Sequence, residues 1–236
     1  MKLSKMAVIS LVLAILGIYI FPPVNLIALI IGFIALNKIR HSAGALKGKA
    51  IVITGIIISC IAIITTVSVV ISYRQHYQAF KLPGDTMTPT INKDERIIID
   101  KKAYASILPD RGDIVVFQLT LSGHKKLLCK RIIGLPNENL EIKDGKIYIN
   151  NNLTLIPGLP KETYYLNGGD FGKQAIKIPD GSYYLLGDNS NKSQDSRYFG
   201  FIKKPDLIGK VILQYSKSTP IRQIADFLKN KGDGSN

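Results

Sequence analysis

The chain has 236 residues and a formal net charge of +14. No Asp or Glu occurs before about position 75, and seven Lys or Arg side chains in that part supply half of the net charge. The remainder is only moderately basic and lacks a basic patch interleaved with aromatic residues, so we expect no nucleic-acid partner. The two cysteines and three histidines show no disulfide or metal-ligand spacing. We therefore expect neither a metal nor a cofactor.

Two long apolar stretches dominate the first part, Met6–Leu36 and Ala50–Ser72. The second has 23 residues, enough for one transmembrane helix, which needs about 20. Pro22-Pro23 interrupts the first near its midpoint and would break a continuous helix. No small-residue cleavage site ends this stretch, which argues against a cleavable signal peptide. Residues 1–75 are therefore predicted to be a lipid-embedded anchor with two or three transmembrane segments.

Basic residues indicate how this anchor is oriented, because positive flanks stay in the cytoplasm. Lys2 and Lys5 precede the first stretch, and Asn37–Lys49 carries four further cations. A hairpin with Pro22-Pro23 at its outer turn would keep both basic flanks in the cytoplasm. Its arms of about 15 residues are short for a full span. The alternative is two spans with the N-terminus outside, which would place Lys2 and Lys5 outside the cytoplasm, against this rule. Both arrangements put His76 onward on the extracytoplasmic side of the cell (inner or plasma) membrane, as part of a multi-pass protein.

Residues 76–236 are predicted to form a soluble domain of short strands, separated by turn residues. Asp144-Gly145 predicts a two-residue hairpin turn, and helical periodicity appears only in Pro220–Lys229. The fold class is thus N-terminal transmembrane helices followed by a mostly β soluble domain with a folded-over or barrel-like sheet. The predicted strands are Arg96–Asp100, Asp113–Leu119, Leu127–Ile133, Leu140–Lys143, Lys146–Asn150, Tyr183–Leu186 and Leu207–Tyr215.

Four stretches of this domain contain the residues that could carry chemistry. Each alone has an ordinary structural explanation, such as a turn, a strand flank or a surface ion pair. Their order behind a membrane anchor makes the combination informative. The stretches are Gly84–Thr90, Arg111–Phe117, Lys130–Glu138 and Gly187–Gly200.

Together these stretches resemble the type I signal peptidase family over about Leu82–Val211. The run Lys-Arg-Ile-Ile-Gly-Leu-Pro, followed by Gly-Asp-Asn and Ser-x-Asp-Ser-Arg, carries most of the resemblance. The resemblance implies that Lys130 is the general base and that Thr86, standing where the family has serine, is the nucleophile. It also implies that Ser193 orients the lysine. The residues that it assigns to supporting the site are Arg131, Gly187, Asp188, Asn189, Asp195 and Arg197.

The physical chemistry of a hydroxyl–lysine dyad agrees with these assignments. A hydroxyl becomes a useful nucleophile when an adjacent base accepts its proton. Lysine can act as that base only when neutral, and burial among apolar side chains favours the neutral amine. The backbone N–H of Thr86 would serve the oxyanion hole. Some relatives add a serine hydroxyl two residues earlier, where this chain has Gly84.

The chain departs from the family pattern at three places. Thr86 adds a methyl group beside the attacking oxygen and restricts χ1, so the cleft must make room for it. Asn137-Glu138 stands where Gly-Asp is usual, and Ser190 stands where arginine is frequent. Of these, Thr86 bears most directly on catalysis.

We therefore expect a membrane-bound endopeptidase that removes N-terminal signal peptides from exported preproteins. Two alternatives stay open: a catalytically impaired homologue that binds preproteins or a partner peptidase, and a dedicated maturase for one exported substrate. The presence of Lys130 and Ser193 favours an active enzyme. A self-cleaving repressor is disfavoured by the anchor and by the lack of a DNA-binding region. The apolar part also resembles a small membrane domain of unknown function, which implies an anchor.

Overall fold

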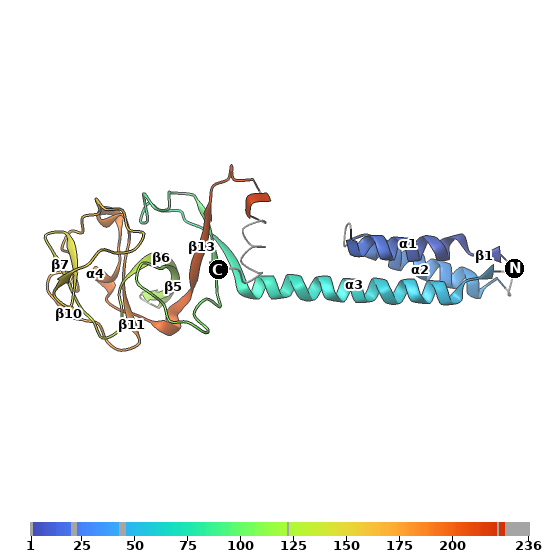
Figure 1. The fold of residues 1–236 in the computed structure, drawn as a ribbon, viewed down its shortest axis with the longest axis horizontal. Helices are drawn as coiled ribbons and strands as arrows, with labels where there is room; N and C mark the ends of the chain where they lie inside the picture. The colour runs from blue at the N-terminus through green and yellow to red at the C-terminus, as the bar shows by residue number, and fades with distance from the viewer. Residues whose placement is uncertain (1, 20–22, 43–45, 122, 221, 225–236) are drawn as a thin grey trace. The chain divides into compact units, whose positions relative to one another are not determined.

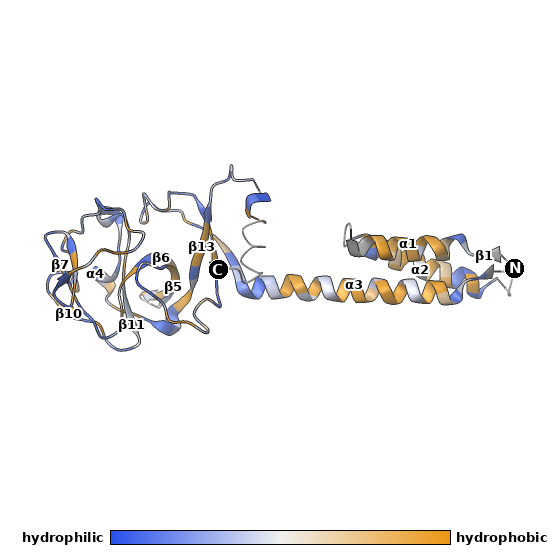
Figure 2. Ribbon diagram, viewed as in Figure 1, coloured by the Kyte–Doolittle hydropathy of each residue, from blue (hydrophilic) through white to orange (hydrophobic). Residues whose placement is uncertain are grey.

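The computed structural model describes residues 2–19, 23–42, 46–121, 123–220 and 222–224. The chain divides into two compact units, Met1–Gln75 and His76–Asn236, and the first contains the apolar stretches. Figure 2 shows that hydrophobic residues dominate its three helices. Its elements are β1 (Lys2–Leu3), α1 (Lys5–Tyr19), α2 (Val24–Arg40), β2 (Leu46–Lys47) and α3 (Lys49–His76).

Small residues allow these helices to pack closely, a feature that is also common in helical membrane proteins. A Cβ at Gly32 would lie 2.8 Å from Cγ1 of Ile56, so a larger residue there would require the Ile56 side chain or the two helices α2 and α3 to shift. The hydroxyl of Ser10 on α1 donates to the backbone oxygen of Ala28 on α2 at 3.2 Å. The three helices therefore form one packed group.

Among the described residues, α3 is the one helix both long and apolar enough to cross a membrane. α1 and α2 have 15 and 17 residues, so at about 1.5 Å per residue both are shorter than a hydrocarbon core of about 30 Å. Pro23 directly precedes α2, whereas Pro22 lies outside the described residues. One candidate span is thus observed, and the number of crossings stays a prediction.

The second unit is mostly β, which confirms the predicted class of this part of the chain (Figure 1). A seven-stranded sheet has the order β12-β11-β6-β5-β13-β4-β3, and a four-stranded sheet has the order β10-β7-β8-β9. The elements are β3 (Tyr77–Lys81), β4 (Arg96–Asp100), β5 (Ile114–Leu121), β6 (His124–Gly134), β7 (Asn139–Lys143), β8 (Lys146–Ile149), β9 (Asn152–Leu153), β10 (Ile176–Lys177), β11 (Ser182–Leu186), α4 (Ser196–Phe199), β12 (Ile202–Lys203) and β13 (Leu207–Tyr215).

The predicted turn between β7 and β8 is confirmed. Asp144 and Gly145 both have positive φ, 49° and 72°, as a type I′ hairpin turn requires. Most of the helix predicted at Pro220–Lys229 lies outside the described residues. The four short or edge strands β3, β9, β10 and β12 were not predicted.

The central strands of the large sheet position the candidate site. On β6, Lys130 lies opposite Val115 of β5 and Arg131 opposite Leu186 of β11. Because side chains alternate along a strand, Val115 and Ile132 share a face with Lys130, and both are completely buried. β11 ends at Leu186, opposite Arg131, so the Gly187–Gly200 stretch begins next to the part of β6 that carries Lys130.

Candidate active site

Lys130 is a buried amine within an apolar sheet face, with 1% of its surface exposed. Burial lowers the pKa of its ammonium below the usual lysine value, and the carboxylates of Asp195 and Asp188 only partly oppose this effect. The arrangement therefore favours a neutral amine, the state that a general base requires.

A buried ion pair joins β6 to the stretch that follows β11. Arg131 donates from Nε and Nη2 to the two carboxylate oxygens of Asp188, at 2.9 and 2.6 Å. The hydroxyl of Thr90 donates to the same carboxylate, and Arg131 Nη1 donates to the backbone oxygen of Gly112 at 2.8 Å. These bonds connect all four stretches singled out in the sequence.

Thr86 lies in a turn that is fastened to the Gly187–Gly200 stretch through its backbone. The amide of Asn189 donates to the backbone oxygen of Thr86 at 3.1 Å, and its side-chain amide donates to that of Asp85 at 3.1 Å. The Thr86 side chain itself is half-buried. A Cβ at Gly84 would meet only Cγ2 of Thr86, at 3.9 Å, so the position two residues before the threonine has room for a side chain.

The side chain of Ser193 and the backbone of Thr86 both lie against Gly187. A Cβ at Gly187 would overlap the hydroxyl of Ser193 and would lie 2.5 Å from the backbone oxygen of Thr86, so only glycine fits between them. The hydroxyl of Ser193 is buried and has no hydrogen-bond partner in the part of the chain that the structure describes. A buried hydroxyl without a partner destabilises the fold, which makes it a candidate for a functional contact.

Asp195 and Arg197 form a second buried ion pair, with 0% and 1% of their side chains exposed. Arg197 donates from Nε and Nη2 to the two carboxylate oxygens at 2.8 and 2.9 Å. Asp195 also accepts from the backbone amide of Gly187 at 3.1 Å, and Arg197 donates to the backbone oxygen of Ser193 at 3.3 Å. The pair therefore braces both ends of the segment that holds Ser193.

Two departures from the family pattern have clear physical roles. Asn137 has φ of 69°, a left-handed conformation in which glycine is the commonest residue and asparagine is well tolerated. Glu138 accepts from Arg111 and from the backbone amide of Leu135 at 2.7 Å. The glutamate thus joins the second stretch to the third.

Residues 164–172 also contact the site, and the sequence analysis assigned them no role. Their contacts are made to Ser190 and Arg197. The signal that could have drawn attention to them is the glycine-rich run Asn167-Gly168-Gly169-Asp170-Phe171-Gly172. The structure thus adds a contacting segment to the residues expected from the sequence.

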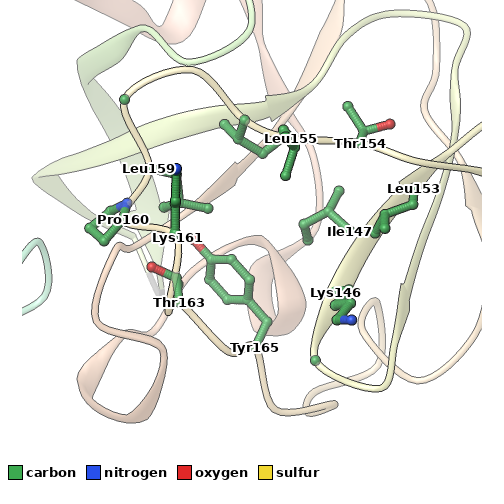
Figure 3. A pocket seen from close by; sticks show the side chains of 13 residues that line it. Lys146, Ile147, Leu153, Thr154, Leu155, Leu159, Pro160, Lys161, Thr163 and Tyr165 are labelled. Carbon is green, nitrogen blue, oxygen red and sulfur yellow. The ribbon is translucent and has the colours of Figure 1, made fainter.

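A separate pocket of about 430 Å³ lies in the β unit (Figure 3). Ile147 and Leu153 line one side, and Leu159 and Tyr165 line the other. None of the residues expected to act in catalysis lines it. Among the described residues no group of three or more His, Cys, Asp or Glu side chains could hold a metal ion.

Comparison with known proteins identifies the class. A family model described as signal peptidase, peptidase S26, matches residues 51–216. Signal peptidase I U of Bacillus subtilis is 34% identical over 184 residues, covering 75% of this chain and 92% of that protein. Probable signal peptidase I-2 of Synechocystis is 33% identical over 142 residues, covering 58% of this chain and 62% of that relative's length.

A crystal structure of a signal peptidase I from Enterococcus faecalis V583 aligns with a TM-score of 0.36 and 32% identity, covering 44% of this chain and 97% of that one. The family match covers more than half of the chain. The protein therefore belongs to the S26 signal peptidase family, and the resemblance inferred from the four stretches is confirmed.

Proposed function

We propose that this protein is a membrane-bound endopeptidase that removes N-terminal signal peptides from exported preproteins. The buried amine of Lys130 is the observation that carries the proposal, because burial lowers its pKa and favours the neutral base. The bonds that fasten the turn of Thr86 to the segment of Ser193 further support it. The family match supports the same activity.

In the proposed reaction, Lys130 Nζ accepts the proton of the Thr86 hydroxyl as its oxygen attacks the scissile carbonyl carbon. The backbone N–H of Thr86 stabilises the oxyanion. The resulting ammonium then donates its proton to the leaving amine as the peptide bond breaks, and water hydrolyses the acyl-enzyme. The Ser193 hydroxyl is buried and has no partner among the described residues. In the reacting complex it would form a hydrogen bond to the lysine amine and so orient it.

The proposed location is the cell membrane, with residues 1–75 as a multi-pass anchor and residues 76–236 as the extracytoplasmic catalytic domain. The apolar helix α3 ends at His76, directly before the β unit. An anchored site would meet the cleavage region of a preprotein near the membrane surface. The cationic flanks of the apolar stretches support the outward orientation.

Incubation of the detergent-solubilised protein with a preprotein tests this proposal. Lys130→Ala should abolish cleavage because the hydroxyl loses its proton acceptor. Lys130→Arg should also be inactive, since a guanidinium does not release a proton at working pH. Unchanged melting temperatures would show that the variants are folded. Substantial turnover by either variant would exclude lysine as the base.

A catalytically impaired homologue is the second candidate, and the methyl group of Thr86 is the observation that favours it. The methyl stands beside the attacking oxygen and restricts rotation about χ1. An impaired homologue would bind a preprotein without cleaving it. Cleavage by the unmodified protein excludes this candidate.

A further inference from the structure

Arg197 connects two segments that are distant in sequence. Besides Asp195, its guanidinium donates to the hydroxyl of Ser190 at 2.8 Å and to the backbone oxygen of Leu166 at 3.0 Å. It also donates to the backbone oxygen of Ser193 at 3.3 Å. One buried side chain thus ties the Ser193 segment to a loop outside the four family stretches.

That loop, Leu166–Gly172, lies against the backbone of Arg197, and we name it the strap. The amide of Phe171 donates to the backbone oxygen of Arg197 at 3.0 Å. A Cβ at Gly169, where φ is +64°, would overlap that oxygen, and a Cβ at Gly172 would lie 2.9 Å from Cγ of Arg197. The nearest atom to a Cβ at Gly172 is the strap's own backbone oxygen of Gly168, which it would overlap. Glycine is therefore required at Gly169 by the backbone of Arg197, and at Gly172 by the turn of the strap as well as by the Arg197 side chain.

Ser190 fastens the other end of the strap. Its hydroxyl oxygen accepts from the backbone amide of Leu166 at 3.1 Å and from Arg197 at 2.8 Å. The hydroxyl thus connects the strap and the guanidinium at a single atom. A methyl group in its place would leave both donors without this acceptor.

We propose that the strap and Ser190 are positioning elements of the peptidase site: they hold Arg197 against Asp195 and thereby fix the segment that carries Ser193. The catalytic part of this inference rests on the proposed function. The structural part does not, because it concerns how firmly residues 187–200 are held. None of the strap residues needs to touch the substrate.

Displacing the strap should also affect the base. The charged and titratable groups that act on Lys130 are Asp195, Asp188 and Cys129, which favour its ammonium, and Arg197, which disfavours it. If Arg197 moves away, water enters and the charge of Asp195 is less compensated. Both changes raise the pKa of Lys130 toward its ordinary value, so less neutral base is present at a given pH.

Gly169→Ala tests the strap, and Gly181→Ala is its matched control. Both glycines have nearly the same φ, +64° and +63°, but a Cβ at Gly181 meets nothing within 4 Å. The variants therefore share the backbone strain and differ in the contact with Arg197. In the full chain, Gly169→Ala should accelerate amide exchange in residues 187–200, whereas Gly181→Ala should not.

For preprotein cleavage, kcat of Gly169→Ala at neutral pH should fall on the order of tenfold to a hundredfold, as for a misplaced catalytic group. KM should change little, and the rising limb of the pH–rate profile should move to higher pH. Equal amide exchange in Gly169→Ala and Gly181→Ala would overturn the proposal.

Ser190→Ala and Ser190→Thr provide the second test. Alanine should reproduce the exchange and pH-profile changes of Gly169→Ala, and threonine should restore wild-type behaviour because it keeps the hydroxyl. Wild-type exchange in Ser190→Ala would exclude a role for Ser190. Accelerated amide exchange in both Gly169→Ala and Ser190→Ala supports the structural role of the strap and Ser190, whatever the result of the peptidase assay. A wild type without peptidase activity would count against the proposed function alone.

Discussion

At the scale of single residues, the site contains groups that a fold optimised only for stability would avoid. Lys130 is a buried lysine whose pKa is lowered by burial. The hydroxyl of Ser193 is buried without a partner among the described residues. Buried, imperfectly satisfied polar groups are costly, and they concentrate where chemistry requires them. The two residues are thus explained better by function than by packing.

The lowered pKa of Lys130 makes a prediction about stability. Because the folded-state pKa lies below the unfolded value, the unfolded chain binds more protons between the two, and stability rises with pH through that window. Lys130→Met should therefore raise the melting temperature at neutral pH, by about 2–4 °C for each kcal/mol gained. The gain should shrink toward pH 10.5, the ordinary lysine value.

Lys126→Met is the control for this experiment, because Lys126 lies exposed on the same strand. Its melting temperature should stay close to that of the wild type across the pH range. A Lys130→Met variant whose melting temperature differs from the wild type by a constant amount at all pH values would contradict the buried neutral amine.

At the scale of elements, two buried ion pairs hold the Gly187–Gly200 stretch in place. One joins Arg131 to Asp188 and the other joins Asp195 to Arg197. Such pairs contribute little over apolar replacements, but breaking one leaves an uncompensated buried charge. Here they hold an irregular stretch in a fixed position next to the part of β6 that carries Lys130.

Asp195→Asn should therefore be strongly destabilising, because it leaves the buried Arg197 guanidinium without its carboxylate. Breaking a buried pair costs about 3–5 kcal/mol, which predicts a fall in melting temperature of roughly 10 °C. Asp94→Asn is the comparison, since its pair with Lys81 is half exposed, and it should leave the melting temperature nearly unchanged. Equal melting temperatures for both variants would contradict the bracing role of Asp195.

The elements also show which parts of the fold the sequence could predict. β4 and β13 have the predicted bounds because each is a run of apolar or β-branched residues between turn signals. β9, β10 and β12 have two residues each, too few for an alternating pattern. β3 follows α3 without an intervening turn, so no signal marked its start.

The same contrast holds for the site. Thr86 and Lys130 could be found because family motifs mark them in the sequence. The strap could not be found in this way, because a glycine-rich run in a sequence indicates only a flexible loop. Only the three-dimensional contact between Gly169 and Arg197 shows why those glycines are needed.

At the scale of the whole molecule, an apolar unit precedes a β unit that carries the candidate site. The proposed orientation predicts that protease added to intact cells or spheroplasts cleaves loops beyond His76 but spares residues 37–49. The physical reason is that the basic loop stays in the cytoplasm. An N-terminal and a C-terminal epitope tag would report the fragments, with a cytoplasmic protein as the control for lysis. Protection of the β unit would contradict the outward orientation.

The central claim is that the Thr86 hydroxyl is the nucleophile and that Lys130 accepts its proton. The most direct test is kcat/KM for preprotein cleavage by the wild type, Thr86→Ala and Thr86→Ser, assayed side by side. The account predicts that alanine removes activity and that serine preserves or raises it, because serine keeps the oxygen, loses the methyl group and gains freedom about χ1. Undiminished cleavage by Thr86→Ala would contradict the account and require another nucleophile.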